Sequence, residues 1–213
     1  MTGGLFPIAL DLTGRPCLVV GGGAVGARKV RGLLAASAHV TVVSPTVTES
    51  FQDWLADGRI RHVPREYRQG DLAGVQLVFV ATDAPGVTSA VAAEGRERGV
   101  WVNAADDPTH CDFHVPAIVR RGDLVVAVAT GGASPALARL VREELERFLG
   151  PDYAMLTDVT RTVRDELRRG GRRASGDAWT SAMRGAVRQL AAEGRRDEAT
   201  TLLRRTLWEA TCE

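Results

Sequence analysis

Residues 17–29 read CLVVGGGAVGARK, a short apolar run that passes through a glycine-rich turn into a helical pattern. Gly21, Gly23 and Gly26 stand in the order G-x-G-x-x-G. In this order the first glycine permits a tight turn out of a strand, the second lets a pyrophosphate approach the backbone, and the third lets the helix pack closely on the strand. Because the turn follows a strand and opens an amphipathic helix, it favours a dinucleotide-binding site over a purely structural glycine turn.

Apolar runs and helical patterns alternate through the first half of the chain. We expect strands at 18–20, 39–43, 60–63, 76–81 and 100–103, and helices at 24–36, 49–56 and 85–98. This alternation predicts an α/β fold with a Rossmann-type, doubly wound parallel sheet. In the first helix we expect an apolar face toward the sheet, with Arg28, Lys29 and Arg31 in solvent. Residues 6–12 are expected to pack an apolar edge against the sheet.

The pattern changes after residue 112. Two runs, 113–120 and 124–129, are separated by a short polar turn and predict a β-hairpin. Ser134 is placed as a helix N-cap, with Pro135 at the first helical position and a helix to about residue 149. Only helical periodicity follows, in pieces near 153–168, 177–192 and 197–209. We therefore expect three parts: residues 1–112, residues 113–150 and residues 151–213.

The composition is that of an ordinary globular protein. The chain has 213 residues, of which 45% are hydrophobic and 25% charged, and a net charge of +1. A balance so close to neutral argues against nucleic acid as a partner. Lys29 is the only lysine, and we attribute the arginine excess first to compositional bias, although arginine also suits a substrate rich in carboxylates.

Nothing in the chain predicts a secreted or membrane protein. Residues 1–8 lack the features of a signal peptide, and no apolar run is long enough to span a bilayer. The three cysteines, Cys17, Cys111 and Cys212, do not form a paired framework. We therefore expect a cytoplasmic protein without a membrane partner.

Three segments are expected to meet where the parallel strands end. These are the glycine turn, Thr82 after the strand at 76–81, and the stretch from Asn103 to Pro108. Asp106 and Asp107 stand in that last stretch, and a carboxylate there can act as a general base beside a nicotinamide. The alternative is that such a carboxylate caps the turn before the proline, and we expect one aspartate in each role.

The residues after the second strand depart from the usual dinucleotide pattern. Ser44, Pro45 and Thr46 occupy the place where an acid would hold the ribose of NAD or an arginine the phosphate of NADP. The choice of cofactor cannot be read from this position. His110, Cys111 and His114 include residue types that bind metals, but their spacing does not match the common zinc patterns, so no metal site is predicted.

The chain resembles the precorrin-2 dehydrogenase / sirohydrochlorin ferrochelatase family over nearly its whole length. The helical tail matches only in general character. The segments that carry the resemblance are FPI at 6–8, VGGGAVGARK at 20–29, ATD at 81–83, VNAADDP at 102–108, FHVPA at 113–117 and GGASPALAR at 131–139.

The resemblance implies a Rossmann domain, a hairpin-plus-helix segment that forms a homodimer, and a small all-helical C-terminal domain. It also implies NAD+ as oxidant and Asp106 as the catalytic residue. Cofactor contacts fall on Ala24, Val25, Pro45 and Thr46. We also include three residues in the predicted cofactor site, because each stands at the end of a predicted strand: Ser44, Thr82 and Asn103. Thr130 stands where some members carry a phosphorylated serine.

The implied reaction removes a hydride and a proton from precorrin-2 to give sirohydrochlorin. Some members also insert Fe2+ at the same site, so Fe2+ is a possible substrate. Because the tetrapyrrole carries eight carboxylates, we expect Arg120, Arg121, Arg139 and the helix N-terminus at Ser134 to anchor it. Some members are fused to a methyltransferase that makes precorrin-2; here we expect a separate protein to supply it.

Two alternatives remain open. The first is a non-catalytic module that senses NAD, because regulators also use Rossmann domains. Asp106, the second glycine turn and the lack of a DNA-binding element ahead of the Rossmann domain argue against it. The second is a dehydrogenase that leaves iron insertion to another protein.

Overall fold

The structure is a computed structural model, and it describes residues 5–210. The chain divides into two compact units, Leu5–His114 and the residues from Val115 onward. This division places one boundary close to the change of pattern after residue 112. Whether 113–150 and 151–213 act as separate domains stays a prediction.

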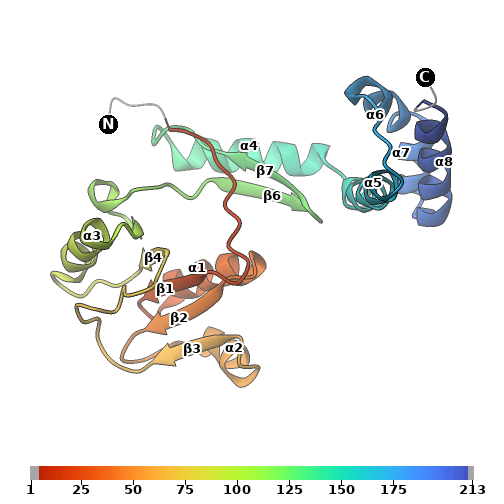
Figure 1. Cartoon of the computed structure of the whole chain (residues 1–213). Helices are drawn as coiled ribbons and strands as arrows, with labels where there is room; N and C mark the ends of the chain where they lie inside the picture. Colours follow the sequence, from red (N-terminus) through yellow and green to blue (C-terminus); the bar gives the residue numbers. More distant parts are fainter. Residues whose placement is uncertain (1–4, 211–213) are drawn as a thin grey trace. The chain divides into compact units, whose positions relative to one another are not determined.

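The first unit contains a five-stranded parallel sheet in the order β3-β2-β1-β4-β5. Figure 1 labels four of these strands, β1 to β4. Its strands are β1 (Pro16–Val20), β2 (His39–Val43), β3 (Ile60–Val63), β4 (Leu77–Val80) and β5 (Trp101–Ala104). Val20 lies opposite Val43 on one side and Val80 on the other, so the strand ends are level. The strand order reverses between β1 and β4, which is where such sheets bind ligands.

Helices cover both faces of this sheet. They are α1 (Ala24–Ala35), α2 (Gln52–Ala56) with the short 3-10 turn η1 (Glu49–Phe51), and α3 (Val87–Arg98). Val19 packs in a core with α1 and α2, whereas Leu18 and Val20 pack in a second core with α3. Alternate residues of β1 therefore enter opposite cores, and the predicted doubly wound α/β fold is confirmed.

The second unit starts with an antiparallel hairpin of β6 (Ala117–Arg121) and β7 (Leu124–Val128). Five helices follow: α4 (Pro135–Phe148), α5 (Asp152–Arg169), α6 (Gly176–Ala182), α7 (Ala186–Ala192) and α8 (Arg196–Glu209). Helices α5 to α8 bury a core of their own, to which Val163 and Leu203 contribute fully buried side chains. The predicted N-cap is confirmed, because Ser134 Oγ accepts a hydrogen bond from the Leu137 N–H at 3.1 Å.

Three segments of the backbone differ from the sequence prediction. Residues 113–116 are not a strand: the Phe113 carbonyl accepts a bond from Asn103, and Pro116 has no N–H to donate. The helix predicted at 177–192 is broken between α6 and α7, where Gly185 has a φ of +62°. Residues 5–10 are exposed, with Phe6 at 86%, so the predicted packing of that segment against the sheet is wrong except at Leu12.

No helix within residues 5–210 is long and apolar enough to cross a membrane.

Candidate functional site

The glycine turn after β1 has the geometry of an anion-binding loop. A Cβ on Gly21 would lie 2.0 Å from the Ala81 carbonyl oxygen, and the φ of Gly21 is +116°. A Cβ on Gly26 would lie 2.3 Å from the Gly21 carbonyl oxygen, whereas a Cβ on Gly23 would meet nothing within 4 Å. Packing therefore requires glycine at positions 21 and 26, whereas position 23 borders open space. The first turn of α1 contains no acidic residue, so its N-terminus fits a pyrophosphate.

The loop after β2 is fixed against this turn through Gly22. A Cβ on Gly22 would lie 2.1 Å from the Thr46 carbonyl oxygen, and the Thr48 N–H donates to the Gly22 carbonyl at 2.9 Å. Ser44 is buried, whereas Pro45 and Thr46 are exposed. Gly22 is not among the residues predicted for the site, although three consecutive glycines are a signal that a second segment approaches closely.

The other predicted segments meet at the same edge of the sheet. The Ala81 N–H donates to the Val20 carbonyl at 2.7 Å, and the Ala105 N–H donates to the Val80 carbonyl at 2.9 Å. Thr82 follows β4 and accepts a bond from the Ala84 N–H at 3.3 Å. The ends of β1, β4 and β5 therefore lie side by side, as the sequence predicted.

Asp106 and Asp107 differ in what their carboxylates contact. Asp107 accepts bonds from the Thr109 N–H at 3.2 Å, the Thr109 hydroxyl at 2.6 Å and His110 Nδ1 at 2.6 Å. The Thr109 hydroxyl and His110 hold the pKa of Asp107 below its usual range. Asp107 is thus the cap of the short turn η2 (Pro108–His110).

Asp106 is exposed and has a φ of +59°, in the left-handed region that most side chains avoid. Within residues 5–210 no side chain or N–H forms a hydrogen bond or ion pair with its carboxylate. One of the two aspartates is expected to cap the turn and the other to act as a general base. Since Asp107 is the cap, Asp106 is the unpaired carboxylate that follows β5.

Lys29 is held in the crevice instead of facing solvent. Its Nζ donates to Asn103 Oδ1 at 3.2 Å and lies 4.7 Å from the centre of the Phe79 ring. Burial lowers the pKa of Lys29, the charge of Arg28 lowers it further, and the charge of Asp106 raises it. The expectation that this lysine lies in solvent is wrong, because its side chain reaches Asn103 on β5 and the Phe79 ring on β4. The sequence signal for a special position of Lys29 is that it is the only lysine in a chain rich in arginine.

Asn103 is 6% exposed, and both ends of its amide are used inside the protein. Besides accepting from Lys29, it donates from Nδ2 to the Phe113 carbonyl at 2.8 Å. Asn103 thus holds the Lys29 ammonium group from inside the protein. The predicted contact of Asn103 with a cofactor stays a prediction.

Two of the three metal-binding residue types near 110–114, His110 and Cys111, have partners inside the protein. The Cys111 thiol donates to the Ala104 carbonyl at 3.2 Å and accepts from the Ala104 N–H at 3.2 Å, and burial raises the pKa of the thiol. His110 bonds with Asp107. Within residues 5–210 no group of three or more His, Cys, Asp or Glu side chains is placed to hold a metal ion. Cys212 lies outside the described residues.

The substrate anchors predicted in the second unit differ in their surroundings. Arg121 donates from Nε to the Leu149 carbonyl at 2.8 Å and from Nη2 to the Glu146 carbonyl at 2.8 Å, so it closes the end of α4. Arg120 and Arg139 are exposed. The Thr130 hydroxyl bonds to the backbone of Ser134, at 3.1 Å to its carbonyl and 3.2 Å from its N–H. A role in substrate binding stays a prediction for Arg120, Arg121, Ser134 and Arg139.

Comparisons with known proteins agree with this geometry. A family model described as "Putative NAD(P)-binding" matches residues 8–117, and one described as "Sirohaem biosynthesis protein central" matches residues 121–147. The chain is 37% identical over 206 residues to the siroheme synthase of Methylobacillus flagellatus, covering 95% of this chain and 44% of that protein. It is 36% identical over 204 residues to that of Nitrosococcus oceani, with coverages of 95% and 44%.

The chain thus spans less than half the length of these curated relatives. A solved structure titled "SirC, precorrin-2 dehydrogenase" superimposes with a TM-score of 0.71 at 27% sequence identity. That match covers 94% of this chain and 100% of the solved chain.

Proposed function

Because the chain belongs to the precorrin-2 dehydrogenase / sirohydrochlorin ferrochelatase family, we propose that it oxidises precorrin-2 to sirohydrochlorin with NAD+, in sirohaem biosynthesis. The observation that carries this proposal is Asp106. Its carboxylate is exposed, has no partner among residues 5–210, and follows β5 at the same edge of the sheet as the glycine turn, with β4 between β5 and β1. An unpaired carboxylate at that place is what a proton-accepting group needs.

The cofactor is proposed to lie across the ends of β1, β4 and β5. The open space at Gly23 and the N–H groups of Ala24 and Val25 at the start of α1 receive the pyrophosphate. Exposed Pro45 and Thr46 border the adenosine side, where no acid or arginine distinguishes NAD from NADP. NAD+ supplies the hydride acceptor when bound.

Asp106 is proposed to take the proton that leaves with the hydride. Removal of one hydride and one proton accounts for the two hydrogens that precorrin-2 loses, and the reaction yields NADH. Lys29 lies close enough to Asp106 that the charge of Asp106 raises the pKa of Lys29, so the two groups share this end of the crevice. The arginines at 120 and 139 and the N-terminus of α4 at Ser134 are proposed to bind substrate carboxylates.

Iron insertion by the same chain stays a prediction. An exposed carboxylate such as that of Asp106 can remove protons from pyrrole nitrogens before Fe2+ enters. Adding Fe2+ to the completed dehydrogenase reaction tests this step. A shift in the sirohydrochlorin spectrum that depends on the enzyme supports it, and a shift that occurs equally without enzyme contradicts it.

We also propose that the chain forms a homodimer in the cytoplasm through the hairpin and α4. On the face of the hairpin formed by Ile118, Val125 and Ala127, apolar side chains are exposed. Leu140 and Phe148 of α4 are 50% and 73% exposed. Apolar surface of this extent is typical of a protein interface.

Anaerobic absorbance of the purified chain with precorrin-2 and NAD+ tests the proposed reaction. Appearance of NADH together with the spectrum of sirohydrochlorin is the expected result. Binding of NAD+ without NADH formation would contradict it and favour the sensing module.

A further inference from the structure

A cavity of about 810 Å³ lies in the helical part of the second unit, between α5, α6 and the segment that joins them. Its lining includes four arginines, and none of the described residues that line it is acidic. Leu167, Trp179 and Met183 supply its apolar surface. We refer to this cavity as the arginine cleft. None of its lining residues belongs to the first unit.

One face of α5 forms a wall of the arginine cleft. Thr160, Arg164 and Arg168 are four residues apart and therefore lie one above the other on the helix. The neighbouring stripe, Val159 and Val163, is fully buried and holds the bundle together. The bundle core is thus complete without the arginines, which are not needed to bury apolar surface.

The arginines of the cleft differ from other arginines of the bundle in their charge partners. Arg196 pairs with Asp158 at 2.7 Å, and Arg204 pairs with Glu166 at 2.6 Å. Within the described residues no carboxylate pairs with Arg164, Arg168 or Arg173. Glu166, which follows Arg164 on α5, is already bound by Arg204.

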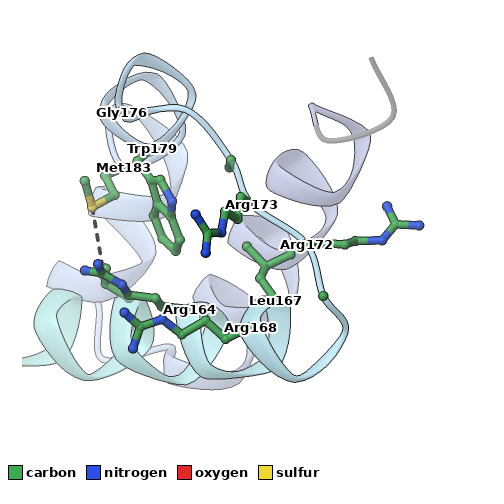
Figure 2. A pocket seen from close by; sticks show the side chains of 11 residues that line it. Arg164, Leu167, Arg168, Arg172, Arg173, Gly176, Trp179 and Met183 are labelled. Atoms are coloured by element: carbon green, nitrogen blue, oxygen red, sulfur yellow. Dashed lines mark hydrogen bonds between the residues drawn. The ribbon is translucent and has the colours of Figure 1, made fainter.

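The fourth arginine of the lining is held elsewhere. The Arg172 guanidinium carbon lies 4.0 Å from the centre of the Trp208 ring. Figure 2 shows Arg172 directed away from the other three, whose guanidinium groups gather beside Trp179. Three cations thus line the cleft without a carboxylate partner among the described residues, and their guanidinium groups are available to an anion.

Trp179 adds a flat apolar surface next to these cations. Its ring is half-buried, and it lies beside Met183, whose sulfur accepts a bond from the Thr160 hydroxyl at 3.4 Å (Figure 2). Guanidinium groups bind carboxylates and phosphates through paired N–H donors, and an indole face binds a flat ring. The cleft therefore offers both halves of a site for an anionic ring compound.

We propose that the arginine cleft binds a flat organic ring that carries several anionic groups. Carboxylates on a tetrapyrrole and phosphates on a nucleotide present the same chemistry to the three arginines. Arg164, Arg168 and Arg173 bind the anionic groups, and Trp179 packs on the ring. The volume of about 810 Å³ lies within the range of sites that hold small organic ligands.

Calorimetric titration of the full chain tests this proposal with two probes, uroporphyrin as an octacarboxylate ring and ATP as a phosphorylated ring. Inorganic pyrophosphate serves as an anion without a ring. We expect saturable binding of at least one ring probe, at least about tenfold tighter than pyrophosphate, that weakens as salt is raised. The ring probe whose affinity falls more in the double variant of Arg164 and Arg168 identifies carboxylate or phosphate as the anionic group.

The decisive variant is the double substitution Arg164→Gln and Arg168→Gln, which should weaken binding by about tenfold or more. Its matched control is Arg184→Gln with Arg205→Gln, which removes two charges from exposed positions that do not line the cleft. Trp179→Leu should weaken the ring probe but leave pyrophosphate unchanged.

Equal loss of binding in the two double variants would overturn the proposal, because it would show attraction to net charge alone. Failure of both ring probes to bind at about millimolar concentration would overturn it as well. The titrations contain no NAD+ and follow no turnover. NADH formation from precorrin-2 is measured separately on the Arg164→Gln and Arg168→Gln variant. Loss of probe binding with unchanged NADH formation assigns the loss to the arginine cleft, whereas absence of NADH formation in the wild type contradicts the proposed function alone.

Discussion

The crevice above the parallel sheet and the arginine cleft of the helical bundle both suit an anionic ligand, but they are built differently. The crevice presents backbone N–H groups at the start of α1, at a turn where Gly21 and Gly26 leave no room for a Cβ. The arginine cleft presents long side chains on helices whose core is complete without them. Changes in the crevice should therefore alter folding and function together, whereas changes in the arginine cleft should alter binding alone.

The largest effect should follow Gly21→Ala. A Cβ there would lie 2.0 Å from the Ala81 carbonyl oxygen, at a φ of +116°, so the end of β1 must move away from β4. We expect the free energy of unfolding to fall by more than about 4 kcal/mol, with loss of NAD+ binding. Urea unfolding followed by circular dichroism measures the first, and calorimetry the second.

Gly23→Ala is the matched control, because a Cβ at that position meets no protein atom within 4 Å. It should leave stability nearly unchanged while weakening NAD+ binding by about tenfold or more, since the methyl group occupies space left for the pyrophosphate. If Gly21→Ala and Gly23→Ala had equal free energies of unfolding, the distinction between a glycine that packing requires and a glycine beside open space would be wrong.

Asp106→Asn should have the next largest effect, on turnover and not on stability. Asparagine tolerates the left-handed conformation but cannot accept the proton, so kcat should fall by about 10²-fold to 10⁴-fold. NAD+ affinity should stay the same. Anaerobic measurement of NADH formation gives the rate.

Asp107→Asn is the matched control, since Asp107 caps η2 through Thr109 and His110. It should lower the melting temperature slightly and keep most of the activity. Near-normal turnover of the Asp106 variant, or an equal loss in both, would remove Asp106 from the proposed mechanism.

Sequence reasoning succeeded where a requirement is local and failed where it depends on distant residues. The glycine spacing and the cap at Ser134 are steric and hydrogen-bonding rules within a few residues, and both are found in the structure. Lys29 was misplaced because helix periodicity cannot show that Asn103, 74 residues away, lies against it. The arginine cleft was missed since unpaired arginines cannot be told from paired ones in a chain so rich in them.

Lys29→Met should have a moderate effect that depends on pH. The variant leaves buried Asn103 Oδ1 without its donor, which should cost about 1–3 kcal/mol of stability at pH 7. Because burial lowers the pKa of Lys29 from 10.5, the charged lysine also destabilises the folded wild type at neutral pH. That penalty disappears as the pH rises through the folded pKa.

The stability gap between wild type and Lys29→Met should therefore widen with rising pH, up to about 10.5. Urea unfolding at a series of pH values measures the gap. Arg31→Met, which removes an exposed charge of α1 that does not act on the pKa of Lys29, should show no such widening. A gap that narrows toward alkaline pH would mean that Lys29 gains a favourable charge partner on folding.

The smallest effect on folding should come from the double variant Arg164→Gln and Arg168→Gln. Both side chains are exposed, glutamine has nearly the same helix propensity as arginine, and no described carboxylate loses a partner. Only Arg168 lies in the last turn of α5, where its charge favours the helix dipole, so the loss of stability should stay below about 1 kcal/mol. NAD+ affinity should not change. Thermal unfolding measures the stability of this variant, and NAD+ titration of the same sample measures its affinity. A large loss of stability would show that the two arginines stabilise the bundle instead of being available to bind a ligand.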